Sequence, residues 1–322
     1  MSSSVSIAMG NLTSVTVLVF ALGFLGARLK SNLQLPDQIY SFISLYLLFG
    51  IGLKGGVQLH QSDFNLIVKP VIVTVLLGVL IPVLAFLLVR LSVKLDELNS
   101  GAVAAHYGST SLVTFTAAIT FLETNNIQFE GFLATLLTIM EIPGIIVGIY
   151  LGSRHLNVGV SWGESLKEII FGKTILLLTG GLVIGAITGT AGYEKVTPLF
   201  VGLLPGFLAL FLMHLGYLAG SQLTQIKIAG LRIGIFAIAF PIMAGSIGVC
   251  AGSLIGLSVG GAVVLGVLCA SASYIAAPAA VGIALPEASK SLPIVASLGV
   301  TFPFNLIVGI PYLYWLAQQI GA

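Results

Sequence analysis

The chain has 322 residues, of which 57% are hydrophobic and only 7% charged, and its formal net charge is +2. A soluble domain carries about 25% charged residues, so lipid must be part of the solvent for a chain this apolar. Its 13 lysines and arginines are scattered and form no basic patch with interleaved aromatics, which argues against nucleic acid as a partner. We therefore expect an all-α integral membrane protein.

Ten apolar segments predict about ten transmembrane helices, because a helix needs about 20 apolar residues to cross the hydrocarbon layer. The first apolar run has no cation ahead of it, whereas Arg28 and Lys30 follow it. This order is the reverse of a secretory signal peptide, so we expect a retained span. The predicted spans are 12–27, 39–57, 70–89, 99–121, 131–152, 174–191, 197–220, 233–256, 259–283 and 292–317.

The positive charges predict an orientation. With the N-terminus outside, ten cations fall in inner loops and three on or near the outer side, and cytoplasmic loops carry the excess of Lys and Arg. We expect a multi-pass protein of a bacterial inner membrane with both termini outside the cytoplasm. The inner cations are Arg28, Lys30, Arg90, Lys94, Arg154, Lys167, Lys173, Lys227, Arg232 and Lys290, and the outer ones are Lys54, Lys69 and Lys195.

Matching segments indicate an internal repeat. A G-x-x-x-G-x-Q-L pattern ends the second span of each half, and two more matches follow in the fourth and fifth spans. Five is an odd number of spans, so the second copy must be inverted. We predict a first five-helix repeat at 1–152, a cytoplasmic linker at 153–173 and an inverted repeat at 174–322. The matches are 52–59 with 216–223, 101–103 with 261–263, and Pro143 and 146–149 with Pro303 and 307–310.

Inverted repeats are typical of secondary transporters, whose sites lie near the bilayer midplane at broken helices. Each half has one predicted break, at 106–111 in the fourth span and at 271–278 in the ninth. The first contains Ser109, Thr110 and Ser111, and the second contains Ser271 and Ser273. Their hydroxyls and freed carbonyls suit Na⁺, and amide N–H groups at a helix start suit an oxyanion. The alternative is that small residues only allow close helix packing.

Glu141 is the most informative single residue, since a carboxylate in the middle of a span is costly and marks a functional site by default. Pro143 beside it frees a backbone carbonyl. Glu141 is a candidate cation ligand or proton carrier, with a structural hydrogen-bonded acid as the alternative. Asn305, near Pro303 in the last span, is a candidate neutral polar contact.

Two other function classes compete with transport. An intramembrane hydrolase would use Ser109 as nucleophile and His106 or His214 as base, but the sequence has no G-x-S-x-G or H-E-x-x-H motif. We expect no enzyme and no organic cofactor, and we expect His214 to be a packing hydrogen-bonder. A ligand-binding receptor or channel without transport is the other class. Cys250 and Cys269 lie in apolar runs and are expected to be small buried residues.

The chain resembles the cyanobacterial sodium-dependent bicarbonate transporters and their bacterial relatives over nearly its whole length. This resemblance implies ten helices in a five-plus-five inverted repeat, core and gate domains, and a homotrimer that imports bicarbonate with Na⁺ as the coupling ion. It implies that Gly108, Ser109, Thr110 and Glu141 lie at the substrate and ion site, with Ser271 and Ser273 opposite, so that Glu141 and Ser109 are possible Na⁺ ligands. The segments that carry it are Ile51–Gly56, Gly108–Thr110, Met140–Pro143, Ser271–Pro278 and Leu316–Ala322.

The chain departs from the family pattern in two places. Tyr274 stands where the resemblance implies an Asp after a serine run, so one intramembrane acid is missing. This departure motivates an alternative, an H⁺-coupled or uncoupled transporter of a different small anion. The linker between the halves is also short, so regulation by a PII-like cytoplasmic protein is an open expectation.

Overall fold

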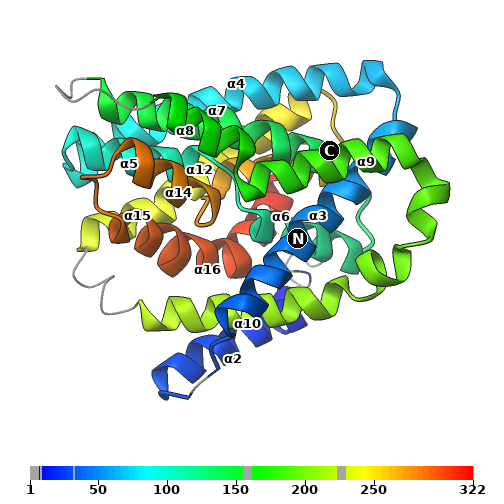
Figure 1. The fold of residues 1–322 in the computed structure, drawn as a ribbon, viewed down its shortest axis with the longest axis horizontal. Coiled ribbons are helices and arrows are strands. Elements are labelled where there is room, and N and C mark those ends of the chain that lie inside the picture. Colours follow the sequence, from blue (N-terminus) through cyan, green and yellow to red (C-terminus); the bar gives the residue numbers. More distant parts are fainter. Residues whose placement is uncertain (1–6, 8, 32, 155–161, 223–229, 322) are drawn as a thin grey trace.

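The computed structural model describes residues 7, 9–31, 33–154, 162–222 and 230–321, which form helices and connecting loops without any strand. Figure 1 shows most of the long helices running roughly parallel, with α4 along one edge and α10 along the opposite edge. The helices are α2 (Val15–Arg28), α3 (Asp37–Gln61), α4 (Phe64–Leu88), α5 (Glu97–Gly108), α6 (Leu112–Thr124), α7 (Leu133–Ser153), α8 (Trp162–Phe171), α9 (Lys173–Glu194), α10 (Leu204–Ser221), α12 (Leu231–Leu254), α13 (Val259–Ala270), α14 (Ala276–Ala284), α15 (Ser291–Ala296), α16 (Phe302–Phe304) and α17 (Ile310–Ile320), with π-helical turns η1 (Val89–Val93), η2 (Pro198–Gly202), η3 (Ser297–Thr301) and η4 (Asn305–Gly309).

In the described part of the chain, seven helices are long and apolar enough to cross a membrane, and they coincide with seven of the predicted spans. The predicted span 197–220 contains two elements, the π-helical turn η2 and helix α10. The long helix therefore begins only at Leu204. Of the other three predicted spans, 12–27 corresponds to the short helix α2. The span 99–121 is divided into α5 and α6, and the span 259–283 is divided into α13 and α14. The seven are Asp37–Gln61, Asn65–Val93, Leu133–Ser153, Lys173–Glu194, Leu204–Ser221, Leu231–Leu254 and Ser291–Ile320.

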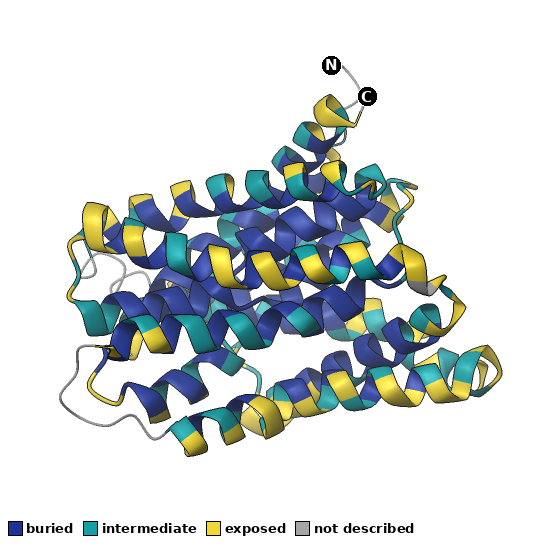
Figure 2. Cartoon of the chain, turned by 90° about the horizontal axis from the view of Figure 1, so that it is seen from above, coloured by how far each residue is buried: buried dark blue, intermediate teal, exposed yellow. Residues whose placement is uncertain are grey.

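The outer surface of the bundle is apolar. Figure 2 shows exposed residues along the outward faces of the peripheral helices, and on α9 they include Leu176, Val183 and Ile187, which is 78% exposed. A monomeric soluble protein rarely exposes an apolar surface of this extent, so this surface fits a multi-pass membrane protein. Cys269 is buried as predicted, but the prediction for Cys250 was wrong, because it lies on the exposed face of α12.

Helices α3 and α9 pack together closely along their lengths. The packing depends on Gly52 and Gly56, the glycines of the first G-x-x-x-G pattern. A Cβ on Gly52 would collide with the carbonyl oxygen of Leu178, and one on Gly56 would collide with that of Leu182. Small residues four apart allow two membrane helices to bring their backbones into contact.

Helices α2 and α10 form a second close pair, and the same kind of contact holds it. Gly216 and Gly220 carry the second G-x-x-x-G pattern. A Cβ on Gly216 would collide with the carbonyl of Phe20, and one on Gly220 would come within 2.7 Å of the carbonyl of Phe24. In both pairs, therefore, the glycine pattern of one half packs against the first predicted span of the other half.

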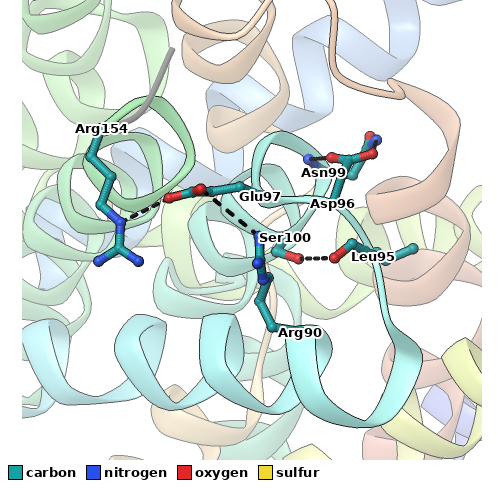
Figure 3. Close-up of polar contacts among 7 residues, drawn as sticks. All are labelled: Arg90, Leu95, Asp96, Glu97, Asn99, Ser100 and Arg154. Atoms are coloured by element: carbon teal, nitrogen blue, oxygen red, sulfur yellow. Dashed lines mark hydrogen bonds and ion pairs between the residues drawn. The ribbon is translucent and has the colours of Figure 1, made fainter.

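A charged cluster fastens the ends of three helices at one end of the bundle (Figure 3). Arg154, at the end of α7, donates from Nε to Glu97 Oε1 at 2.8 Å, and Arg90 Nη1 in η1 lies 3.9 Å from Glu97 Oε2. Asp96 caps α5 by accepting the Asn99 N–H at 2.7 Å. Both guanidinium groups also lie over the ring of Phe86. The cluster places three of the charged side chains of predicted inner loops together.

The predicted linker 153–173 contains helix α8, which lies between α7 and α9. Ser165 and Ile169 of α8 are buried, and the helix packs against α14. Glu164 and Lys167 are exposed, and so are Ile170 and Phe171 at the end of the helix. This part of the linker is thus an amphipathic helix docked on the bundle, and 155–161 lie outside the described residues.

Candidate functional site

Helix breaks occur at both predicted places. Helix α5 ends at Gly108 and α6 begins at Leu112, while α13 ends at Ala270 and α14 begins at Ala276. Serine side chains start the second helix of each pair, because hydroxyls near a helix start satisfy its free N–H groups. Ser111 accepts the Thr114 N–H at 3.2 Å. The Ser273 hydroxyl accepts the N–H groups of residues 276 and 277, at 3.3 and 3.2 Å.

The two breaks are joined by hydrogen bonds between distant parts of the sequence. The Ser111 N–H donates to the Ser271 hydroxyl at 3.0 Å. The Ser273 N–H donates to the carbonyl of His106 at 2.8 Å. The Ser111 hydroxyl donates to the Tyr274 hydroxyl at 3.3 Å. Each break thus supplies partners for backbone groups that the other break has released from its helix.

Glu141 of α7 faces the first break and is only 2% exposed. The Thr110 hydroxyl donates to its Oε2 atom, and the Thr110 backbone N–H also faces the carboxylate. The Ser109 hydroxyl also lies near the Glu141 carboxylate, but the geometry of this contact is not that of a hydrogen bond. The hydroxyl therefore has no hydrogen-bond partner among the described residues. Gly144, one turn further along α7, packs so closely on Gly108 that a Cβ would collide with its carbonyl oxygen.

A small cavity of about 10 Å³ lies where these groups meet. This volume is close to the space that a single water requires, so the cavity in this conformation suits a small ion more than a polyatomic anion. Glu141 is the one carboxylate among its described lining residues. The lining consists of Leu48, Thr110, Ser111, Leu112, Leu137, Glu141, Thr174, Leu178, Ser273, Tyr274 and Ile275.

The predicted site residues divide into three groups. Thr110, Ser111, Glu141 and Ser273 line the cavity. Gly108, Ser109 and Ser271 lie in or beside the breaks, behind that lining. Asn305 lies further off and donates to the carbonyl of Ala270 at 2.8 Å, with no partner for its Oδ1 among the described residues. Asn305 therefore supports the end of α13 and does not face the cavity.

The histidines do not form the nucleophile-and-base pair of the hydrolase hypothesis. His106 donates from Nδ1 to the carbonyl of Ala102 at 2.8 Å. His214 accepts the Leu35 N–H at 3.1 Å on its Nδ1, as expected for a packing hydrogen-bonder. In the described chain, neither histidine is hydrogen-bonded to Ser109.

Several lining residues lie outside the predicted site. Leu48 comes from α3, and Thr174 and Leu178 come from α9. No motif marks them, because they reach the cavity only through the packing of the α3–α9 pair against α7. Tyr274, noted in the sequence only as a departure from the family pattern, is itself part of the lining and contacts the ring of Phe302.

Comparison with known proteins identifies one family. The model of the Na⁺-dependent bicarbonate transporter superfamily matches residues 15–318 of the chain. No curated protein matches the chain in sequence.

Proposed function

Because the chain belongs to the Na⁺-dependent bicarbonate transporter superfamily, a family of transporters and not of enzymes, we propose that it imports bicarbonate or a similar small monoanion together with Na⁺ by alternating access. One observation carries the proposal. A single buried carboxylate, Glu141, lines the same cavity as the two broken helices.

Glu141, Thr110 and Ser109 are the proposed Na⁺ ligands. Carboxylate and hydroxyl oxygens at a broken helix suit this ion, which unwound segments coordinate in other secondary transporters. The Ser109 hydroxyl supports the assignment, since a buried polar atom without a partner is costly unless something binds it. Bound Na⁺ would offset the charge of Glu141 and lower the cost of bringing an anion nearby.

The proposed anion ligands lie at the starts of α6 and α14. The amide groups of a helix start favour negative charge. Ser111 and Ser273 of the cavity lining belong to these two starts. Since the cavity is small in this conformation, admission of the anion requires the surrounding helices to separate.

Alternating access is supported by cavities on both sides of the site. Along α7, Leu133 and Ala134 line one recess, Leu137 and Glu141 line the central cavity, and Ile145 lines a second recess on the opposite side. The second recess shares Thr174 and Ile275 with the central cavity. These side chains would close the path on that side.

The inverted repeat of 1–152 and 174–322 around the linker 153–173, with ten membrane-crossing segments counting the broken ones, is part of the same proposal. The packing of the two glycine patterns supports it. In the first half α3 carries the pattern and packs against α9 of the second half, and in the second half α10 carries the pattern and packs against α2 of the first half. We assign these four helices to the gate and the remaining spans to the core.

The orientation and the assembly are also proposals. We place the protein in a bacterial inner membrane with both termini outside, as a homotrimer. A PII-like regulator would bind the side that carries the linker, where helix α8 is docked. Mass photometry of the protein in detergent tests the trimer, and a mass of one chain would contradict it.

The test of Na⁺ coupling is uptake of labelled bicarbonate by proteoliposomes, with an inward gradient of Na⁺ or of choline. We expect uptake only with Na⁺. Glu141→Gln should abolish it, because a neutral amide does not balance the charge of the ion, while the matched change of an exposed acid, Glu194→Gln, should leave it intact.

Thermal stability gives a second measurement of the same site. A ligand that binds only the folded protein raises the melting temperature, so Na⁺ should stabilise the wild type relative to K⁺ and should not stabilise Glu141→Gln. Equal uptake in choline, or unchanged Na⁺ dependence in Glu141→Gln, would contradict the proposal.

H⁺ coupling to another anion is the second candidate, and Tyr274 favours it. The cavity has one carboxylate and a phenol where the family resemblance implies a second acid. In this version Glu141 would carry the proton. Uptake driven by a pH gradient without Na⁺, accompanied by proton movement, would support it over Na⁺ coupling.

A further inference from the structure

A recess with a volume of about 60 Å³ lies between α3, α6 and the start of α7. It adjoins the central cavity and lies about one helical turn away from it on each of these helices. Ile51 of the recess follows Leu48 of the cavity on α3, and Phe115 follows Leu112 on α6. One turn corresponds to about 5.4 Å, so the recess is the next space beyond the candidate site. By the proposed orientation it opens outward.

The recess contains one cation, Lys54, among its described lining residues. Its ammonium lies 3.2 Å from Oε1 of Glu123, and the two side chains are 35% and 51% exposed. An ammonium has three N–H donors, and Glu123 is its one acceptor in the described chain. Lys54 therefore has donors to spare inside the recess.

The other carboxylate of the recess does not compete for Lys54. Glu130 accepts the backbone N–H of Ser258 at 2.6 Å and its hydroxyl at 3.0 Å. These contacts fasten Glu130 to the start of α13. Among the described residues, the ion pair of Lys54 with Glu123 is then the contact of this ammonium that a small anion could exchange, and partly exposed pairs of this kind are weak.

We propose that Lys54 forms an outer subsite for the transported anion, where a small oxyanion such as bicarbonate replaces or joins Glu123 on the ammonium before it reaches the central cavity. The subsite rests on the proposed function. It also gives a role to a lysine at the end of a span that lines a recess. The exchange would also release α3 from α6, which the ion pair joins.

The kinetic test compares two variants that break the same ion pair. Lys54→Gln removes the ammonium and should raise the KM for bicarbonate about threefold to tenfold, the effect of losing a charged hydrogen bond in a partly exposed place. Glu123→Gln leaves the ammonium free and should leave KM unchanged or lower it. Lys54→Arg should restore most of the affinity. Equal changes in Lys54→Gln and Glu123→Gln would show a merely structural ion pair and overturn the proposal.

A labelling test works without any transport assay. Thr120→Cys places a thiol in the recess of a chain that carries Cys250→Ala and Cys269→Ala. The rate with an anionic methanethiosulfonate is divided by the rate with a cationic one, each taken relative to free cysteine, and this ratio should fall with Lys54→Gln and rise with Glu123→Gln. A ratio that Lys54→Gln leaves unchanged would overturn the subsite. Wild-type liposomes that take up no bicarbonate would instead overturn the proposed function, whatever the labelling shows.

Discussion

At the scale of single residues, the charge of the candidate site comes from one half of the chain. Glu141 is buried and accepts the Thr110 hydroxyl. The second half contributes uncharged groups, since Ser273 and Tyr274 line the cavity there. In the proposed function, the carboxylate of Glu141 on α7 would balance the charge of a bound cation. The uncharged polar groups of the second half would then face the anion.

The contact of Gly144 with Gly108 holds Glu141 beside the first break, and it allows a direct prediction. Gly144→Ala would place a Cβ against the Gly108 carbonyl, and overpacking of this kind costs about 1–3 kcal/mol. We expect a lower melting temperature in detergent and weaker Na⁺ stabilisation.

The matched control for this change is Gly180→Ala in α9. A Cβ on Gly180 meets nothing within 4 Å, and alanine favours a helix over glycine by about 0.8–1.0 kcal/mol. The control should keep or raise the melting temperature. If the Gly144→Ala protein is as stable as Gly180→Ala, the contact between α5 and α7 accommodates the added methyl group at little cost, which contradicts the prediction.

At the scale of elements, the two broken helices are held as one unit by hydrogen bonds across the breaks. Ser271→Ala removes the acceptor of the Ser111 N–H, which lies in a buried site. A buried donor left without a partner costs about 1–3 kcal/mol. We expect a lower melting temperature and a higher KM for the anion, since the start of α6 loses its fixed position.

Ser92→Ala is the comparison for that variant. The Ser92 hydroxyl, at an exposed position in η1, donates to the carbonyl of Leu88 one turn earlier, so its loss should change stability by less than about 0.5 kcal/mol. If both serine variants behave alike in thermal unfolding and uptake, the link between the breaks has no special role.

At the scale of the whole molecule, two groups of side-chain contacts join α3 to α9, one at each end of α3. Lys173 donates to Ser41 near its start, whereas Gln61 donates to Thr190 at its end. The first group lies with the predicted inner cations and the second with the predicted outer loops. By the proposed orientation, the first group lies on the inner side of the membrane and the second on the outer side.

Labelling with a membrane-impermeant maleimide tests that orientation in intact cells. In a chain with Cys250→Ala and Cys269→Ala, Gln128→Cys should be labelled from outside, and Ser31→Cys only after the membrane is opened. Both positions are exposed, and the proposed orientation puts them on opposite sides of the bilayer. The reverse pattern would invert the topology, and with it the assignment of Lys54 to the outer side.

The sequence alone determined the membrane class, the long spans and the positions of the helix breaks. The physical reason is that lipid constrains every segment separately, since each span must be long and apolar and must satisfy its own backbone. Glu141 stood out for the same reason, because a carboxylate in an apolar run is costly wherever its neighbours lie. The family resemblance, which rests on local motifs, was confirmed by the match over 15–318.

Only the tertiary structure decided which groups face one another. Thr110 faces the cavity while Ser109 lies behind its lining, and Leu48 and Thr174 enter that lining from helices that carry no motif. The same holds for Glu130, which accepts the backbone N–H of Ser258 at the start of α13. These contacts join segments far apart in the chain, so they depend on helix packing and leave no local pattern in the sequence.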